Sequence, residues 1–301
     1  MNRITLSRSF RDDQRQLLLD AENSWLFKNR QMAKPFADFI GKYFLDTRIQ
    51  KKINQLKRNK PNLTIGETHC HSTYSDGLHS IESILLRASL LGLDYVVITD
   101  HLVPGKYLIN SIIDSLKEQV RCINEWALPS NPIKIYPAFE ISALEGHLVL
   151  IFSPEYFTPK KICDISLQFS DLDYQFISML DIIPRIAPLG GISIIAHPNQ
   201  KRAYPFGVSI KWIEKNLIGL ADGIEDISSG HGYQANYSQN LDLASIGSSD
   251  DHFNLLMGTA VTAYDSNIHS DLILAVKSRQ TVAINVDNSL QSLLKVARQA
   301  L

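Results

Sequence analysis

Residues 66–77 of the chain read Gly66-Glu-Thr-His69-Cys-His71-Ser-Thr-Tyr-Ser75-Asp76-Gly77, the end of a predicted strand followed by a polar loop. Side chains alternate between the two faces of a strand, so His69 and His71 should point to one side and Cys70 to the other. Two imidazoles on one face suit a metal ion such as Zn²⁺, and Asp76 offers an oxygen ligand nearby. Alone this is a weak signal, because exposed and hydrogen-bonded histidines are common.

The same pattern, in which ionisable residues stand at or just beyond the end of an apolar run, recurs along the chain. The residues concerned are Asp100, His101, Glu140, His197, Asp250 and His252, and His147 joins them at the other end of the loop that starts at Glu140, just before the next apolar run. A hydrogen-bonded core histidine would explain any one of these positions, but that explanation would have to apply independently at six histidines. We therefore predict that they meet in one metal cluster.

Apolar runs and helical patterns alternate beyond residue 61. We expect strands at Leu63–His69, Tyr95–Thr99, Ile133–Phe139, His147–Phe152, Ile192–Ala196, Gly223–Ile227 and Ser245–Ser248, with a further edge at Thr281–Val286. We expect helices at Ile81–Leu91, Ile109–Ala127, Tyr174–Ile186 and Asp271–Ser278. This alternation predicts a parallel sheet closed into a barrel, whose strand carboxyl ends form the ligand-binding face.

Composition limits the class of protein. The 301 residues are 45% hydrophobic and 20% charged, which indicates a globular chain rather than a disordered or fibrous one. The formal net charge of −1 argues against a surface built as a whole for nucleic acid or anionic membrane. Three cysteines without a C-x-x-C pair favour a reducing compartment, and no run has the length of a signal peptide or a membrane span. We expect a soluble, cytoplasmic protein.

The first 61 residues differ from the rest and predict a helical extension, with helical patterns at Gln14–Phe27 and Met32–Phe44. The segment 48–60 is basic, and we interpret it as a solvated helix face and linker rather than as a nucleic-acid contact, which stays the alternative. The expected organisation is an extension at 1–61, a hydrolase barrel at 62–287 and a C-terminal helix at 288–301.

Taken together, the motifs resemble the PHP (polymerase and histidinol phosphatase) family of metal-dependent phosphoesterases. The matching segments are H-x-H-x-x-x-S-D-G at 69–77, T-D-H at 99–101, the glutamate at 140 with the histidine at 147, A-H-P at 196–198 and D-x-H at 250–252. Residues 139–147, 258–262 and 274–282 look like the carbaryl-hydrolase-type subgroup. The extension at 1–61 has no counterpart in the family pattern.

The resemblance implies a distorted, TIM-barrel-like (β/α)₇ barrel that holds two or three divalent ions, which we expect to be Zn, Mn or Fe. One site would use His69, His71, Glu140 and Asp250. A second would use Glu140 as a bridge with His147 and His197, and a third Asp76, His101 and His252.

Such an ion array favours hydrolysis of a small phosphate ester or nucleotide by a metal-bound hydroxide. A carboxyl-ester or carbamate hydrolase with the same site is the alternative, and a non-catalytic, metal-stabilised binding module is a third hypothesis. His101 or Asp100 could transfer a proton to the leaving group, although His101 is a ligand first. Lys201 and Arg202 are either contacts for the substrate phosphate or solvated loop charges.

Other polar residues near these motifs receive structural interpretations or none. Glu225 is either an acceptor for a ligand histidine or a salt-bridge partner. Period-two alternation turns Asp251 away from Asp250 and His252, and Cys70 is interpreted as a packed thiol. The remaining histidines, His79, His231 and His269, follow no obvious apolar run and stay unassigned.

Overall fold

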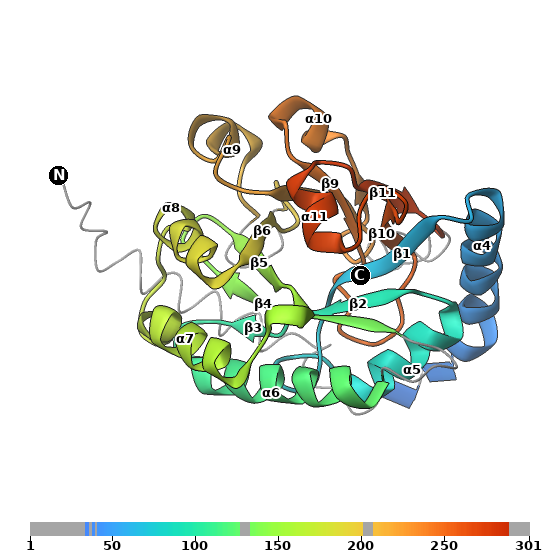
Figure 1. Ribbon diagram of the computed structural model, residues 1–301, viewed down its shortest axis with the longest axis horizontal. Coiled ribbons are helices and arrows are strands. Elements are labelled where there is room, and N and C mark those ends of the chain that lie inside the picture. Colours follow the sequence, from blue (N-terminus) through green and yellow to red (C-terminus); the bar gives the residue numbers. More distant parts are fainter. Residues whose placement is uncertain (1–33, 36–37, 40, 127–132, 201–206, 289–301) are drawn as a thin grey trace, which may run out of the picture.

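The computed structural model describes residues 34–35, 38–39, 41–126, 133–200 and 207–288, which form a mixed α/β structure (Figure 1). The strands are β1 (Leu63–Cys70), β2 (Tyr95–Ile98), β3 (His101–Leu102), β4 (Lys134–Ser142), β5 (His147–Phe152), β6 (Gly191–Ile195), β7 (Gly223–Ser228), β8 (Tyr233–Gln234), β9 (Ala244–Ser248), β10 (Ala260–Asp265) and β11 (Val282–Asn285). The α-helices are α4 (Asp46–Asn59), α5 (Ile81–Leu91), α6 (Ile109–Trp126), α7 (Pro159–Phe169), α8 (Met179–Ile182), α9 (Ile210–Asn216), α10 (Tyr237–Leu241) and α11 (Leu272–Lys277).

The strands form one curled sheet in the order β11-β10-β1-β2-β4-β5-β6-β7-β8, with β9 also paired to β7 and β3 to β4. The pairs β1–β2, β2–β4, β6–β7 and β7–β9 are parallel. The pairs β4–β5, β5–β6, β7–β8, β1–β10 and β10–β11 are antiparallel. The α/β class and the barrel-like sheet are therefore confirmed, but the expectation of a parallel sheet is wrong at these five pairings. The link 143–146 between β4 and β5 is far too short for a parallel crossover, which needs about a dozen residues.

Two further elements differ from the expectations. Strand β10 was not predicted, although it pairs with both β1 and β11. The helix expected at Tyr174–Ile186 is wrong, because only α8 is α-helical there and short 3₁₀ turns follow it. Pro184 and Pro188 lie in those turns, and a proline has no backbone N–H for a continuing helix.

The sheet approaches closure where β9 meets β1 and β10. The hydroxyl of Thr68 in β1 donates to the carbonyl of Gly247 in β9 at 2.9 Å, and Gly247 N donates to the hydroxyl of Thr262 in β10 at 2.9 Å. Beyond β9, His71 N donates to the carbonyl of Asp251 at 3.0 Å. Between β9 and its neighbours β1 and β10, hydrogen bonds from side-chain hydroxyls thus mostly replace the regular backbone pairing of a sheet.

The strands are covered on both faces. Helices α5, α6 and α7 lie along one side of the sheet, next to β1, β2 and β4 (Figure 1). Inside the barrel, Leu272, Ala275 and Val276 of α11 belong to one buried cluster with side chains from β2, β4, β5, β6 and β9. Helix α11 therefore fills the interior, and strands buried on both sides explain their nearly continuous apolar sequence.

Helix α4 is docked on the barrel. Its Ile49 and Ile53 are fully buried in a cluster that includes Met257 and residues of α5. On its basic side, Lys57 Nζ lies 2.6 Å from Asp94 Oδ1, and Lys52 Nζ lies 3.2 Å from Asp287 Oδ2. The structure thus corrects the expected linker at 48–60, because residues 46–59 are one packed helix.

Parts of the expected organisation lie outside the described residues. These are the helical pattern at Gln14–Phe27 and almost all of the C-terminal helix at 288–301. The domain boundaries after residues 61 and 287 stay predictions. Within the described ranges, no helix combines the length and the apolar character needed to cross a bilayer.

Candidate metal centre

The nine expected ligands come together at one end of the barrel. Most of them lie at the carboxyl end of a strand or in the loop that follows it. His147 is the first residue of β5, but β5 runs antiparallel to β4, and the register pairs His147 with Ser142 at the end of β4. The chain reverses direction between β4 and β5, so His147 lies at the same end of the sheet as Glu140.

The first group consists of His69, His71, Glu140 and Asp250. Asp250 Oδ1 lies 3.0 Å from His71 Nε2 and 3.3 Å from His69 Nε2. Glu140 Oε2 lies 3.4 Å from His69 Nε2 and 3.7 Å from His71 Nε2. Two nitrogens and two oxygens thus surround one point.

The second group uses the other oxygen of Glu140. Glu140 Oε1 lies 3.0 Å from His147 Nδ1 and 3.3 Å from His197 Nε2. The two imidazole nitrogens are 3.2 Å apart. Glu140 therefore lies between the first and the second group, as a bridging carboxylate would.

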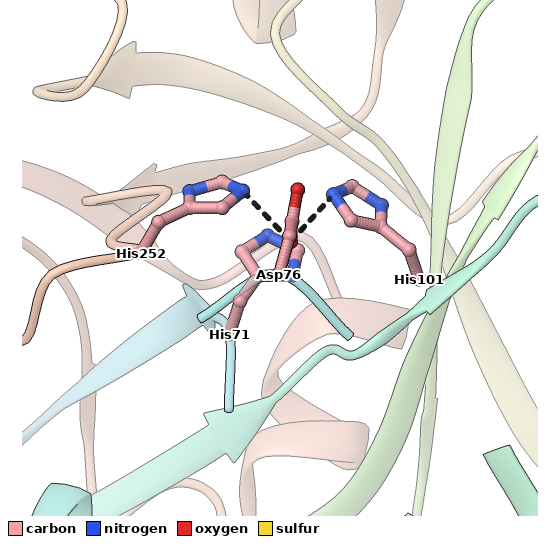
Figure 2. A group of neighbouring side chains, drawn as sticks. All are labelled: His71, Asp76, His101 and His252. Carbon is pink, nitrogen blue, oxygen red and sulfur yellow. Dashed lines mark ion pairs between the residues drawn. The ribbon is translucent and has the colours of Figure 1, made fainter. Parts of the chain in front are cut away.

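The third group is Asp76, His101 and His252, with His71 beside it (Figure 2). Asp76 Oδ1 lies 3.2 Å from His252 Nε2 and 3.5 Å from His101 Nε2, the two ion pairs dashed in Figure 2. His101 Nδ1 is in turn 2.8 Å from Glu140 Oε2. The third group is therefore continuous with the other two.

The donor atoms fit divalent cations. His69 Nε2, His101 Nδ1 and Glu140 Oε2 are buried and form no hydrogen bond with the described residues, although they lie within a few ångströms of one another. Buried polar atoms usually have a partner, and unpaired nitrogens and oxygens that converge are what a bound cation satisfies. Imidazole and carboxylate donors suit Zn²⁺, Mn²⁺ and Fe²⁺.

The close packing of carboxylates and imidazoles shifts the pKa values of these side chains. Burial opposes the charged form of His69, but Glu140, Asp250 and Glu225 outweigh it and raise its pKa well above the usual value. Burial and the neighbouring His252 and His101 lower the pKa of His71 to about 3. Burial also opposes ionisation of Glu140, yet the surrounding histidines hold its pKa well below the usual value. The carboxylates therefore stay ionised, and the site attracts cations or protons.

Glu225 supports the first two groups from outside. Its Oε1 lies 2.7 Å from His69 Nδ1, and its Oε2 accepts a hydrogen bond from His197 N at 2.8 Å. A carboxylate on the far nitrogen of a ligand histidine fixes the ring and its tautomer. Of the two interpretations of Glu225, the acceptor for a ligand histidine agrees with these contacts.

Asp100 holds a loop in place through its hydrogen bonds, and its expected role in proton transfer stays a prediction. Its carboxylate accepts hydrogen bonds from the amide and hydroxyl of Ser72, at 2.8 and 2.6 Å, and from the hydroxyls of Ser75 and Ser115, at 2.8 and 2.6 Å. The side chain is fully buried, and these four donors occupy both oxygens. Asp100 therefore anchors the loop that carries Asp76.

The backbone is constrained where ligands leave the strands. A side chain at Gly77 would place its Cβ 2.2 Å from the carbonyl oxygen of His71, so the loop can return this closely only with glycine. His197 and Asp250 have positive φ values of 28° and 49°, which cost L-residues about 1–3 kcal/mol each. They are two of the six non-glycine residues with positive φ in the described ranges. Strain of this kind occurs at functional sites.

One residue of the site was not predicted. His231 Nε2 lies 2.7 Å from Asp250 Oδ2. The signal was present in the sequence, because His231 follows the end of β7 by three residues, but the glycines around it suggested an ordinary turn.

The other residues singled out from the sequence lie outside the cluster. His79 Nε2 lies 2.9 Å from Asp38 Oδ1, and His269 Nε2 lies 2.6 Å from Gln280 Oε1. Cys70 is buried in the core, and the carboxylate of Asp251 accepts hydrogen bonds from backbone amides of its own loop, as at Met257. Lys201 and Arg202 lie outside the described residues.

No protein-family model matches the chain, and no curated protein matches it significantly. Solved structures do resemble it. PsfC from Pseudomonas syringae is 17% identical, with a TM-score of 0.52 over 79% of this chain and 99% of that one. A two-domain protein from Bacteroides vulgatus that contains a predicted PHP-like metal-dependent phosphoesterase is 19% identical, with a TM-score of 0.48 over 74% and 65% of the two chains. Endonuclease Q, solved with duplex DNA bearing an abasic lesion, is 14% identical, with a TM-score of 0.46 over 67% and 52%.

At such low identity the likeness shows a shared fold. The resemblance of the motifs to the PHP family and to its carbaryl-hydrolase-type subgroup stays a prediction.

Proposed function

We propose that the chain is a metal-dependent phosphoesterase of the PHP family that hydrolyses a small phosphate ester or nucleotide. The observation that carries this proposal is Glu140, whose two oxygens face histidines of all three ligand groups. Two or three divalent cations held there would lower the pKa of a bound water toward neutrality and offset the charge on phosphate oxygens.

The ligand groups differ in their access to solvent, which indicates where substrate enters. The side chains of His69 and Glu140 are fully buried, and those of Asp250, Asp76 and His101 are 10–11% exposed. His252, at 25%, is the most exposed of the nine ligands. The third group therefore borders the opening. We assign it to the substrate phosphate and the first two groups to the water that attacks.

The remaining residues position these ligands. His101 contacts both Glu140 and Asp76 and is a ligand first, so a proton for the leaving group would come from solvent or from an uncoordinated form of His101. Asp100 contributes by fixing the loop of Asp76. Lys201 and Arg202 stay candidates for the substrate phosphate on the sequence alone.

The basic segment 48–60 gives little support to a nucleic-acid substrate. Arg48 and Lys52 both pair with Asp287, and Lys57 pairs with Asp94, so these cations hold α4 on the barrel. A small substrate therefore remains our choice, together with the expectation of a cytoplasmic location.

The test is a substrate panel with added Mn²⁺ or Zn²⁺ and with EDTA as the metal-free control. The panel holds p-nitrophenyl phosphate, bis-p-nitrophenyl phosphate and p-nitrophenyl acetate. We expect metal-dependent turnover of a phosphate ester that is lost in Asp250→Ala and kept in His269→Ala. Turnover of acetate alone would instead establish the carboxyl-ester alternative, and no turnover by a metal-loaded protein would favour the binding module.

A further inference from the structure

His231 lies against the metal centre and is not one of the nine expected ligands. Its ligand atom and those of His197 and Asp250 all lie within 4.8 Å of one another. It follows β7 in the sequence Ser228-Ser-Gly230-His231-Gly, and its side chain is 17% exposed. Its ring lies 4.4 Å from the ring of His197, measured between centroids. It is therefore a fixed part of the wall beside the second group.

The two oxygens of Asp250 have different neighbours. Oδ1 faces His71 Nε2 at 3.0 Å and His69 Nε2 at 3.3 Å, within the first ligand group. Oδ2 faces His231 Nε2 at 2.7 Å, the shortest contact of this carboxylate. A carboxylate held through one oxygen cannot rotate the other away from the first group.

The backbone fixes His231 relative to Asp250. Gly230 N donates to the carbonyl of Ser249 at 2.8 Å, so the turn is tied to the residue just before Asp250. A side chain at Gly230 would place its Cβ 2.6 Å from that carbonyl oxygen and 3.1 Å from the carbonyl oxygen of Asp250. Only glycine permits this approach, which brings His231 to its partner.

We propose that His231 is a positioning residue, which donates its Nε2–H to Asp250 Oδ2 and thereby directs Oδ1 toward the cation of the first group. The inference rests on the proposed metal centre and adds a tenth residue to it. Groups that orient ligands from outside set metal affinity, and losing one typically costs about 10- to 100-fold in affinity or activity.

The experiment compares variants that keep or remove the donor. His231→Gln keeps an N–H at similar reach, His231→Leu removes it, and His231→Phe removes it but keeps a ring against His197. His269→Leu, at a half-buried histidine that contacts Gln280 and none of the ligands, is the control. Bound Zn²⁺ is counted by elemental analysis, dissociation constants come from competition with a chromogenic chelator, and thermal unfolding of the metal-free proteins reports their folding.

We expect His231→Leu and His231→Phe to weaken one class of bound Zn²⁺ by about 10- to 100-fold, while His231→Gln and His269→Leu stay close to wild type. Wild-type affinity in both donor-free variants would overturn the inference and leave the proposed function intact. An equal loss in His231→Gln would also overturn it, because the hydrogen bond would then not matter. A wild-type protein that binds no Zn²⁺ would overturn the proposed function and this inference with it.

Discussion

Arg87→Met should destabilise the protein and disturb the loop that carries His252. Arg87 lies in α5, and its side chain is only 8% exposed. Its guanidinium donates to Asp46 Oδ1 of α4, from Nη2 at 2.8 Å and from Nε at 3.1 Å. It also donates to the carbonyls of Asn254 and Leu255, two and three residues beyond His252. One buried cation therefore joins α4, α5 and the loop after β9.

The magnitude follows from what methionine leaves behind. Methionine keeps the apolar stem but removes every donor, so two carbonyls lose a partner at about 1–3 kcal/mol each. The carboxylate of Asp46 is 25% exposed and recovers part of its loss from water. Breaking a buried ion pair by removing one partner costs about 3–5 kcal/mol, and we expect the free energy of unfolding to fall by that amount.

Urea unfolding of the metal-free protein measures this change, with Arg58→Met as the control. Arg58 is exposed on α4, and its replacement should stay within about 0.5 kcal/mol of wild type. Arg87→Met should also weaken metal binding by the group that contains His252. A loss below about 1 kcal/mol, with metal affinity unchanged, would refute the role of Arg87 as the link between α4 and the site.

Three further predictions concern the site itself. Glu140→Gln keeps the side-chain volume but removes the charge that faces all three ligand groups. Metal affinity should therefore fall by more than the roughly 10- to 100-fold that is typical when a residue supporting a ligand is lost. Calorimetric titration with Mn²⁺ checks this, and wild-type affinity would contradict the bridging role. Asp100→Asn replaces one of the two acceptor oxygens by an NH₂ donor and should lower the free energy of unfolding by about 1–3 kcal/mol in urea, without a change in the pH profile of hydrolysis. A changed profile would support proton transfer by Asp100. Although burial favours neutral His252, Asp76 and Asp250 raise its pKa to about 10, so it is charged at neutral pH and must lose a proton to bind metal. Metal affinity should therefore fall as the pH falls. Calorimetric titrations with metal in buffers of different ionisation enthalpy should show that protons are released when the metal binds. Metal binding without proton release would contradict the assignment of His252 as a ligand.

The sequence was sufficient to predict that most of the nine expected ligands meet, because period-two alternation places His69 and His71 on one face and the ends of parallel strands share one edge of the sheet. Their division into three groups came from the resemblance to the PHP family, and His147 reaches the same edge because β5 is antiparallel to β4. His231 escaped this reasoning because its position depends on a glycine turn that packs against Ser249. That contact joins two segments with no common sequence pattern.

The fold was predicted less completely where partners decide the structure. Strand β10 is defined by its pairing with β1 and β11 rather than by a pattern of its own. Helix α4 looked like a solvated basic segment, because the burial of Ile49 and Ile53 depends on a barrel surface that local charge does not indicate. The propensity and charge of a segment describe that segment alone, whereas the way a helix or strand packs depends on the element beside it.

Anomalous X-ray scattering at the zinc edge, from crystals grown with Zn²⁺, tests the metal centre most directly. We predict one peak bounded by His69, His71, Glu140 and Asp250, and a second beside His147 and His197, at about 2.0–2.2 Å from the donor atoms. Anomalous peaks found only elsewhere on the molecule, with these side chains left without an ion, would contradict it.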